Sequence, residues 1–150
     1  MSTQAIVNQY IHDHIPITIA LGSVVELATP QKVMVTAPFL NNINHKQTVF
    51  GGSLHAITTL ACWGLLYTNF IESLGKIDIV ISKSEIDYKL PIKSDFAAIC
   101  ERPDTLIWTK FEQMLARKGK GRICLEATIT ENGKIAVAYQ GEFAVLKQVG

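Results

Sequence analysis

The chain of 150 residues is long enough for one domain with a sizeable core. Hydrophobic residues make up 48% of it and charged residues 18%, which excludes a disordered chain. The net charge of +1 gives no overall attraction to nucleic acid or to an acidic surface, so we expect neither as a partner.

The first segment predicts a short amphipathic helix followed by a β-hairpin. Apolar residues recur at helical spacing from Thr3 to His14, and Pro16 ends this helix, which we expect to cover one edge of the domain. The stretches Ile19 to Leu27 and Lys32 to Ala37 are strand-like, with a turn at Thr29-Pro30-Gln31 between them.

A loop from Phe39 to Phe50 leads into one long apolar helix. We expect the helix to end near Leu74, with Gly75 as its C′ residue. The run from Val49 to Ile71 also has the length of a membrane span. Polar residues and glycines within the run, and the lack of a similar segment elsewhere, favour instead a core helix wrapped by a sheet. We therefore expect no membrane association.

The second half of the chain predicts four strands. The apolar face of the first one switches partway, which indicates a bulge near Ser82 to Ser84. Asn132-Gly133 is a strong hairpin signal, and Thr105 to Ala116 has room for one or two helical turns. The predicted strands are Ile77 to Lys89, Ser94 to Arg102, Arg122 to Glu131 and Lys134 to Lys147.

This order of elements predicts an α+β fold: a long antiparallel β-sheet wrapped around one central α-helix, with a short N-terminal helix. No linker or repeat divides residues 1–150, so we expect a single domain. Such a sheet has open edges, and pairing across a two-fold axis is therefore expected.

The cysteines indicate a reducing compartment. Cys62, Cys100 and Cys124 are odd in number, widely spaced and embedded in apolar segments, so we expect buried free thiols. No pair has metal-ligand spacing, and we expect no metal site. The N-terminus lacks the pattern of a signal peptide, which together with the thiols predicts a cytoplasmic protein.

The stretch from Asn42 to Ile71 holds the candidate site, and it contains no Asp or Glu. Gly51 and Gly52 lack a Cβ and let a ligand approach the backbone closely. We expect Ser53 to be the N-cap, which leaves free N–H groups at the helix start that favour an anionic oxygen. A Gly-Gly pair before a helix is also common as a simple tight turn. The polar residues that precede it in a buried setting favour a functional role.

Several other polar residues are candidates for binding a substrate. Thr48 is able to donate to a ligand or to cap its own loop, and Ser53 is a better cap than nucleophile. His55 either faces a pocket or packs within the helix layer. The basic run from Arg117 to Arg122 either forms a solvated loop or binds phosphate and acidic helices. The binding residues would be Lys118, Lys120 and Arg122.

Three segments carry a resemblance to a known family: APFLNNINHKQTVFGGS, TTLACWGLLY and the Ile86-Asp87-Tyr88 strand with Pro91. The basic run Arg117 to Arg122 and the strand Leu125 to Thr130 complete the match. With the element order, they resemble the hotdog fold of acyl-thioester enzymes. More narrowly, the chain resembles the bacterial thioesterase-like family of the YiiD C-terminal-domain type. Studied members of that family decarboxylate malonyl-acyl carrier protein to the acetyl form, which supplies primers for fatty acid biosynthesis.

The resemblance implies specific roles. Asn44, the second Asn of Asn-Ile-Asn, takes the catalytic position, and the N–H of Gly51 or Gly52 binds the thioester oxygen. The site lies at a homodimer interface, and dimers of dimers are also expected. The substrate brings its own phosphopantetheine on acyl carrier protein or coenzyme A, so no separate cofactor is expected. Asn41 and the His45-Lys46 pair are not matched to the family pattern.

The chemistry agrees with a reaction that needs no base. Decarboxylation requires stabilisation of an enolate oxygen, and an amide donor at Asn44 with a helix N–H would supply it. The alternative is an acyl-coenzyme A or acyl-carrier-protein thioesterase, for which a carboxylate base is usual. A third possibility is a non-catalytic module that binds acyl groups or docks a carrier protein.

Overall fold

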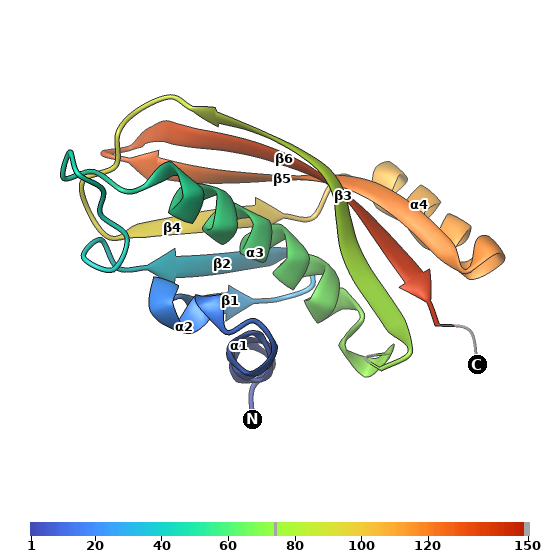
Figure 1. Ribbon diagram of the computed structural model, residues 1–150. Coiled ribbons are helices and arrows are strands. Elements are labelled where there is room, and N and C mark those ends of the chain that lie inside the picture. The colour runs from blue at the N-terminus through green and yellow to red at the C-terminus, as the bar shows by residue number, and fades with distance from the viewer. Residues whose placement is uncertain (74, 149–150) are drawn as a thin grey trace.

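The computed structural model describes residues 1–73 and 75–148, and it has the predicted architecture (Figure 1). Six antiparallel strands form one sheet in the order β1-β2-β4-β5-β6-β3, which curves around helix α3. This is the hotdog arrangement expected from the sequence. The strands are β1 (Val24–Ala28), β2 (Lys32–Ala37), β3 (Ile77–Tyr88), β4 (Phe96–Glu101), β5 (Lys120–Glu131) and β6 (Lys134–Lys147).

Helix α3 (Gly51–Asn69) is the core of the domain. Side chains on nearly all its sides are buried, among them Ile57, Leu65 and Leu66 at 0% exposure. Burying each such side chain contributes about 1.5–3 kcal/mol, so this helix is the largest single contributor to the core. Within the described residues, no helix has both the length and the hydropathy needed to cross a membrane.

Helix α1 (Thr3–His14) matches its predicted limits and covers the β1 edge. It buries Val7 and Ile11, and its polar side chains bond the backbone of the edge strand. The N–H of Val25 donates to Asn8 Oδ1 at 2.9 Å, and Gln4 Nε2 donates to the carbonyl of the same Val25. This edge is therefore closed to further strand pairing.

The predicted strand from Ile19 to Leu27 is wrong in its first half. Residues Ile17–Leu21 form a short helix, α2, which ends at Gly22 with φ of +69°, and strand β1 begins only at Val24. A short apolar run fits a strand or a buried helical turn equally well, so its periodicity did not distinguish them. The helical form aims Leu21 and the buried Thr18 toward α3.

Further boundaries differ from the predictions in informative ways. Helix α3 ends at Asn69 with Phe70 as its C-cap, so Gly75 is not its C′ residue; Leu74, its predicted end, lies outside the described residues. Helix α4 (Thr105–Lys118) is longer than expected and is capped by Asp104, whose side chain accepts from Ile107 N at 3.0 Å. A 3₁₀ turn, η1 (Ile71–Ser73), follows α3.

Two local predictions in the second half of the chain are confirmed, the bulge in β3 and the turn between β5 and β6. Register shifts between Ile81 and Lys83, so β3 carries its bulge where the sequence indicated. Asn132 and Gly133 both have positive φ, at 51° and 78°, as a tight hairpin turn requires. The prediction that the cysteines are buried is confirmed for Cys62 and Cys100 and is wrong for Cys124, which is exposed on β5.

The edge contact of Asn8 makes a testable prediction. Replacing Asn8 with Ala removes the acceptor of a backbone N–H at Val25, a residue that is 1% exposed. We expect Asn8→Ala to lower the free energy of unfolding by about 1–2 kcal/mol, measured by urea denaturation. Asn8→Asp keeps an acceptor oxygen and should lose less than half as much; equal losses in both variants would contradict this role.

Candidate active site at the start of the central helix

The loop before α3 is fixed by its first Asn. Asn42 is 3% exposed, and its Nδ2 donates to the carbonyls of Leu21 (2.9 Å) and Pro38 (2.8 Å). The carbonyl of Asn42 accepts from Phe50 N at 2.7 Å. Asn42 therefore joins the end of α2, the end of β2 and the start of α3, and its role is structural.

The second Asn, Asn44, organises the tip of the loop. Its Oδ1 accepts the backbone N–H groups of Lys46 (2.9 Å) and Thr48 (3.2 Å), and its Nδ2 donates to Thr48 Oγ1 at 3.0 Å. The two accepted bonds fix which end of the carboxamide carries nitrogen. One of the two N–H groups on Nδ2 is used by Thr48, so the other is available to a ligand. Thr48 thus stabilises its own loop, which was one of the two roles expected from the sequence.

The start of α3 differs from the prediction at Ser53. The helix begins at Gly51 with Phe50 at the N-cap position, and Ser53 lies inside the first turn, buried at 6% exposure. Ser53 N donates to the Phe50 carbonyl at 3.0 Å. Within the part of the chain that the structure describes, the N–H groups of Gly51 and Gly52 have no hydrogen-bond partner. The expected free donors are present, although Ser53 does not cap them.

Tyr88, at the end of β3, lies against this turn. Its hydroxyl donates to the Gly51 carbonyl at 3.3 Å, and a Cβ on Gly51 would lie 3.5 Å from the Tyr88 ring. Both residues line a small cavity of about 260 Å³ with Val49, Leu54, Pro91 and Ile92. Gly51, which carries one of the free amides, therefore lies beside a cavity whose lining contains no carboxylate.

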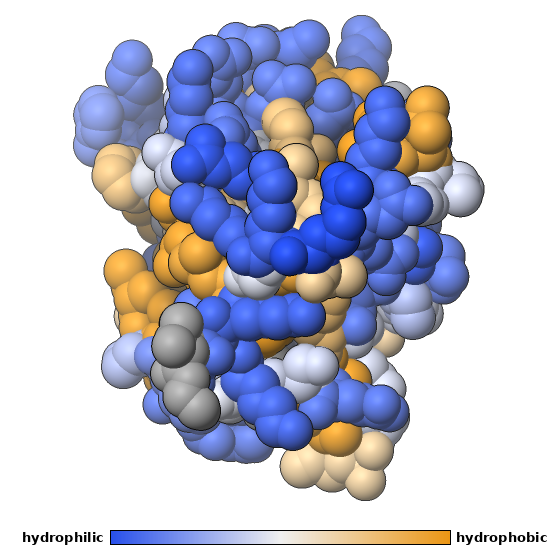
Figure 2. Space-filling view, turned by 90° about the vertical axis from the view of Figure 1, so that its right-hand side faces the viewer, coloured by the Kyte–Doolittle hydropathy of each residue, from blue (hydrophilic) through white to orange (hydrophobic). Residues whose placement is uncertain are grey.

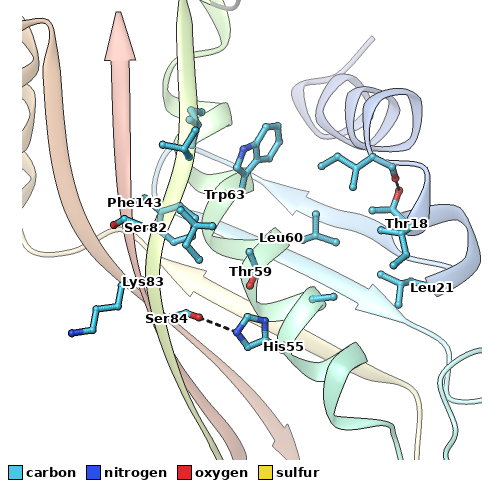
Figure 3. Close-up of a pocket in the computed structure, with 16 residues that line it drawn as sticks. Thr18, Leu21, His55, Thr59, Leu60, Trp63, Ser82, Lys83, Ser84 and Phe143 are labelled. Carbon is cyan, nitrogen blue, oxygen red and sulfur yellow. Dashed lines mark hydrogen bonds between the residues drawn. The ribbon is translucent and has the colours of Figure 1, made fainter.

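A larger cavity of about 810 Å³ lies between α3, the first half of β3 and α2 (Figure 3). Apolar side chains dominate its lining, including Leu21, Leu60, Trp63, Ile79, Ile81 and Phe143. His55 and Lys83 are its ionisable lining residues, and Figure 3 shows the Lys83 side chain pointing away from α3. The space has the size and character of a site for an aliphatic group.

His55 lines this larger cavity and not the one at Gly51, and it also packs between α3 and the sheet. Its Nε2 lies 3.0 Å from Ser84 Oγ, and its ring meets the Tyr139 ring edge-on at 5.4 Å. One turn later, Thr59 Oγ1 donates to the Tyr139 hydroxyl at 2.9 Å. Burial raises the pKa of Tyr139 to about 12, so this phenol stays neutral at physiological pH.

The basic residues lie at the other end of the molecule from the loop tip (Figure 1). Arg117 and Lys118 lie in the last turn of α4, and Lys120 and Arg122 begin β5, so the run is exposed to solvent but does not form a loop. This end of the molecule is mostly hydrophilic (Figure 2). Arg122 lies 3.9 Å from Glu142 in an exposed ion pair. Within one subunit, the three basic candidates do not join the Gly51 and Gly52 turn. Of the other candidates, Asn44 lines neither of the two cavities, and His55 lines only the larger one.

Sequence reasoning missed Ser84, Tyr88, Thr59 and Tyr139 as parts of the site. Gly51, His55 and Thr59 are spaced four residues apart and so share one helix face, a signal that would have found Thr59. Ser84, Tyr88 and Tyr139 reach the site only through strand register. The described residues contain no group of three or more His, Cys, Asp or Glu placed to hold a metal ion.

Comparisons with known proteins agree with this fold. A family model described as "Putative thioesterase (yiiD_Cterm)" matches residues 4–147. A protein of unknown function from Chlorobaculum tepidum TLS is 34% identical, with a TM-score of 0.89 over 97% of this chain and 94% of that one.

Two further crystal structures share the fold at lower identity. A "putative thioesterase" from Shewanella oneidensis is 24% identical, with a TM-score of 0.81 over 96% of this chain and 97% of that one. PA5026 from Pseudomonas aeruginosa, described as a protein of unknown function and "probable thioesterase", is 18% identical, with a TM-score of 0.84 over 99% and 97%.

The buried phenol of Tyr139 predicts a pH dependence of stability. An exposed tyrosine in the unfolded chain ionises near pH 10, whereas the folded-state pKa of Tyr139 is about 12. Below pH 10 both states keep the proton; as pH rises from 10 toward 12 only the unfolded state loses it. The free energy of unfolding should therefore fall above pH 10, by up to about 1.4 kcal/mol per pH unit for this residue. Tyr139→Phe should show a shallower fall in urea denaturation, and parallel curves would contradict the assignment.

Proposed function

Because the chain belongs to the thioesterase-like family whose model spans residues 4–147, we propose that it is an enzyme acting on acyl thioesters. We propose further that its reaction is the decarboxylation of a malonyl thioester carried by acyl carrier protein. The observation that carries this proposal is the pair of free N–H groups at Gly51 and Gly52, in a segment without Asp or Glu from Asn42 to Ile71.

The proposed chemistry develops one negative charge at a fixed place. The bond between the malonyl carboxylate and Cα breaks, carbon dioxide leaves, and the electron pair moves to the thioester oxygen as an enolate. The amides of Gly51 and Gly52, at the positive end of the α3 dipole, stabilise that oxygen. The unused N–H of Asn44 is the third donor. Protonation of Cα by His55 or water then gives the acetyl thioester.

An acid-free site favours this reaction for an electrostatic reason. A carboxylate beside the bound malonyl group would repel both the substrate and the developing enolate. The linings of the two cavities contain no Asp or Glu. Hydrolysis, in contrast, requires a group that activates water, and His55 is the residue in these linings best suited to that task.

Acyl thioester hydrolysis is the second candidate, and the large apolar cavity favours it. A malonyl group needs little apolar space, whereas a fatty acyl chain would fill much of a cavity of about 810 Å³. Under this alternative, the same Gly51 and Gly52 amides would bind the oxyanion of a tetrahedral intermediate.

A matched pair of Asn44 variants separates the catalytic role from the loop role. In Asn44→Asp, a carboxylate oxygen still accepts from the N–H groups of Lys46 and Thr48, but the donor is lost. We expect both Asn44→Asp and Asn44→Ala to slow decarboxylation of malonyl-acyl carrier protein about 100-fold or more. Asn44→Asp should keep its unfolding free energy within about 1 kcal/mol of wild type. The measurement is mass spectrometry of malonyl and acetyl carrier protein over time.

The outcome of the same assay decides between the candidates. Release of free thiol from acyl thioesters without acetyl product would favour hydrolysis. Wild-type rates of acetyl formation in Asn44→Asp would remove Asn44 from the mechanism. Binding of thioesters without any turnover would favour a non-catalytic module.

The proposed enzyme is a homodimer joined through β3. The β1 edge is closed by α1, whereas β3 is a 12-residue edge strand with Val80 and Ile81 exposed at 45% and 42%. Antiparallel pairing of two such strands would place the start of one β3 beside the end of the other. Lys118 and Lys120 lie near the start of β3, so they would approach the Gly51 end of the neighbouring subunit. That arrangement suits a phosphopantetheine phosphate or an acidic carrier protein.

A double substitution tests this interface. Val80→Lys with Ile81→Lys places charges on the open edge, where a two-fold axis brings like charges together. We expect the double variant to dissociate into monomers with a Kd raised about tenfold or more, measured by light scattering during size-exclusion chromatography. Ile135→Lys, at a 50% exposed site on β6, is the control and should leave the dimer unchanged. A wild-type monomer at all concentrations would contradict the interface.

A further inference from the structure

Two cavities follow one another along the seam between α3 and β3. The smaller one holds Gly51 and Tyr88 at the start of the helix, and the larger apolar one begins at His55 and extends to Trp63. They share no lining residue. A group bound at the free amides therefore has a large apolar space further along the same seam. Side chains that separate the two cavities lie between that group and the apolar space.

The hydrogen bond between His55 and Ser84 lies between these cavities. It joins α3 to β3, and Figure 3 shows it crossing the seam at the end of the larger cavity that faces the start of α3. His55 follows Gly51 by one helical turn, about 6 Å along the axis. On the opposite wall, Ser84 precedes Tyr88 by four residues, about 13 Å along the strand. Both walls thus place the pair beyond the amides and before the apolar space.

The bulge in β3 is what aims Ser84 at His55. Before the register shift the odd residues Ile77 and Ile79 are half-buried, and after it the even residues Ser84 and Ile86 are. Without the extra residue, Ser84 would point to the outer face of the sheet. The Tyr139 ring against His55 holds the imidazole in position from the β6 side.

We propose that the His55–Ser84 pair sets the acyl chain length that the site accepts. This inference rests on the proposed function, in which the thioester oxygen lies at the Gly51 and Gly52 amides. A malonyl or acetyl group ends before the pair. A longer chain enters the apolar cavity only by separating His55 from Ser84, which leaves two partly buried polar groups without their partner. The pair therefore selects short acyl groups, although the space behind it suits an aliphatic chain.

Non-cleavable ketone analogues of pantetheine, in which a methylene group replaces the thioester sulfur and the carbonyl oxygen is kept, test this selection without turnover. One analogue with a two-carbon acyl part (the ethyl analogue) and one with a twelve-carbon acyl part (the dodecyl analogue) are titrated calorimetrically into the wild type, Ser84→Ala and His55→Ala. We expect the wild type to bind the dodecyl analogue no more tightly than the ethyl one. Both variants should bind the dodecyl analogue about tenfold more tightly than the wild type does, with the ethyl Kd changed less than twofold. Ser84→Ala changes a half-buried strand position, so it still tests the selection if His55→Ala does not fold.

Thr59→Val is the matched control, because Thr59 lies one turn deeper in the same cavity and bonds Tyr139 instead of β3. It should leave the ratio of the two Kd values at the wild-type level. Tighter dodecyl binding by the wild type, or an unchanged ratio in Ser84→Ala and His55→Ala, overturns the selection. Either result leaves the Asn44 assay to decide the reaction. A changed ratio in a protein that converts no thioester supports the selection and overturns the proposed function.

Discussion

The burial of α3 inside the curved sheet is the constraint on which the site depends. A helix whose Ile57, Leu65 and Leu66 are fully buried cannot shift or tilt without opening cavities in the core, at a cost of several kcal/mol. Its first turn is therefore held in one place relative to β3. The Gly51 and Gly52 amides are fixed donors as a result, and fixed donors stabilise a developing charge without reorganising.

The same burial explains why the preceding loop is so polar. The loop must leave the end of β2 and enter the core helix within a few residues, so its backbone groups need local partners. Asn42 supplies two of them through its carboxamide, and Asn44 supplies two more at the loop tip. Asn44 holds a structural role and an unused donor at once, and neither role excludes the other.

The two edges of the sheet differ, and this asymmetry is the reason that the proposed dimer forms through β3. Asn8 and Gln4 satisfy the β1 edge from within the chain, whereas β3 presents a long outer edge. The seam that carries both cavities lies along that same β3. A second subunit would therefore cover the site as it pairs, which links assembly to the shape of the substrate space.

Much of this fold follows from local sequence patterns. Helix α1, strand β2, strand β6 and the Asn132-Gly133 turn have the limits that periodicity and turn chemistry predict. The failures have physical causes. Ile17 to Leu21 is too short a run for its hydrophobic period to distinguish a helix from a strand. Helix α3 begins at Gly51, but the low helix propensity of its two glycines favoured a start at Ser53. Cys124 lies between buried Ile123 and Leu125, so strict alternation on β5, and not local hydropathy, decides its exposure.

The candidate site was only half predictable, because one of its walls depends on register. Asn44, Gly51, Gly52 and His55 are close in sequence, and helical geometry alone brings three of them to one end of α3. Ser84 and Tyr88 come from a strand whose face switches at the bulge between Ile81 and Lys83. The sequence indicates that the switch exists, since the apolar positions change parity there. Which residue it turns inward depends on where β6 sets the register, a long-range pairing that no local pattern encodes. A one-residue slip of β3 would put Glu85 in place of Ser84, and a carboxylate would then face His55 and the acyl path. The bulge position is therefore as much a part of the site's chemistry as the helix that carries the amides.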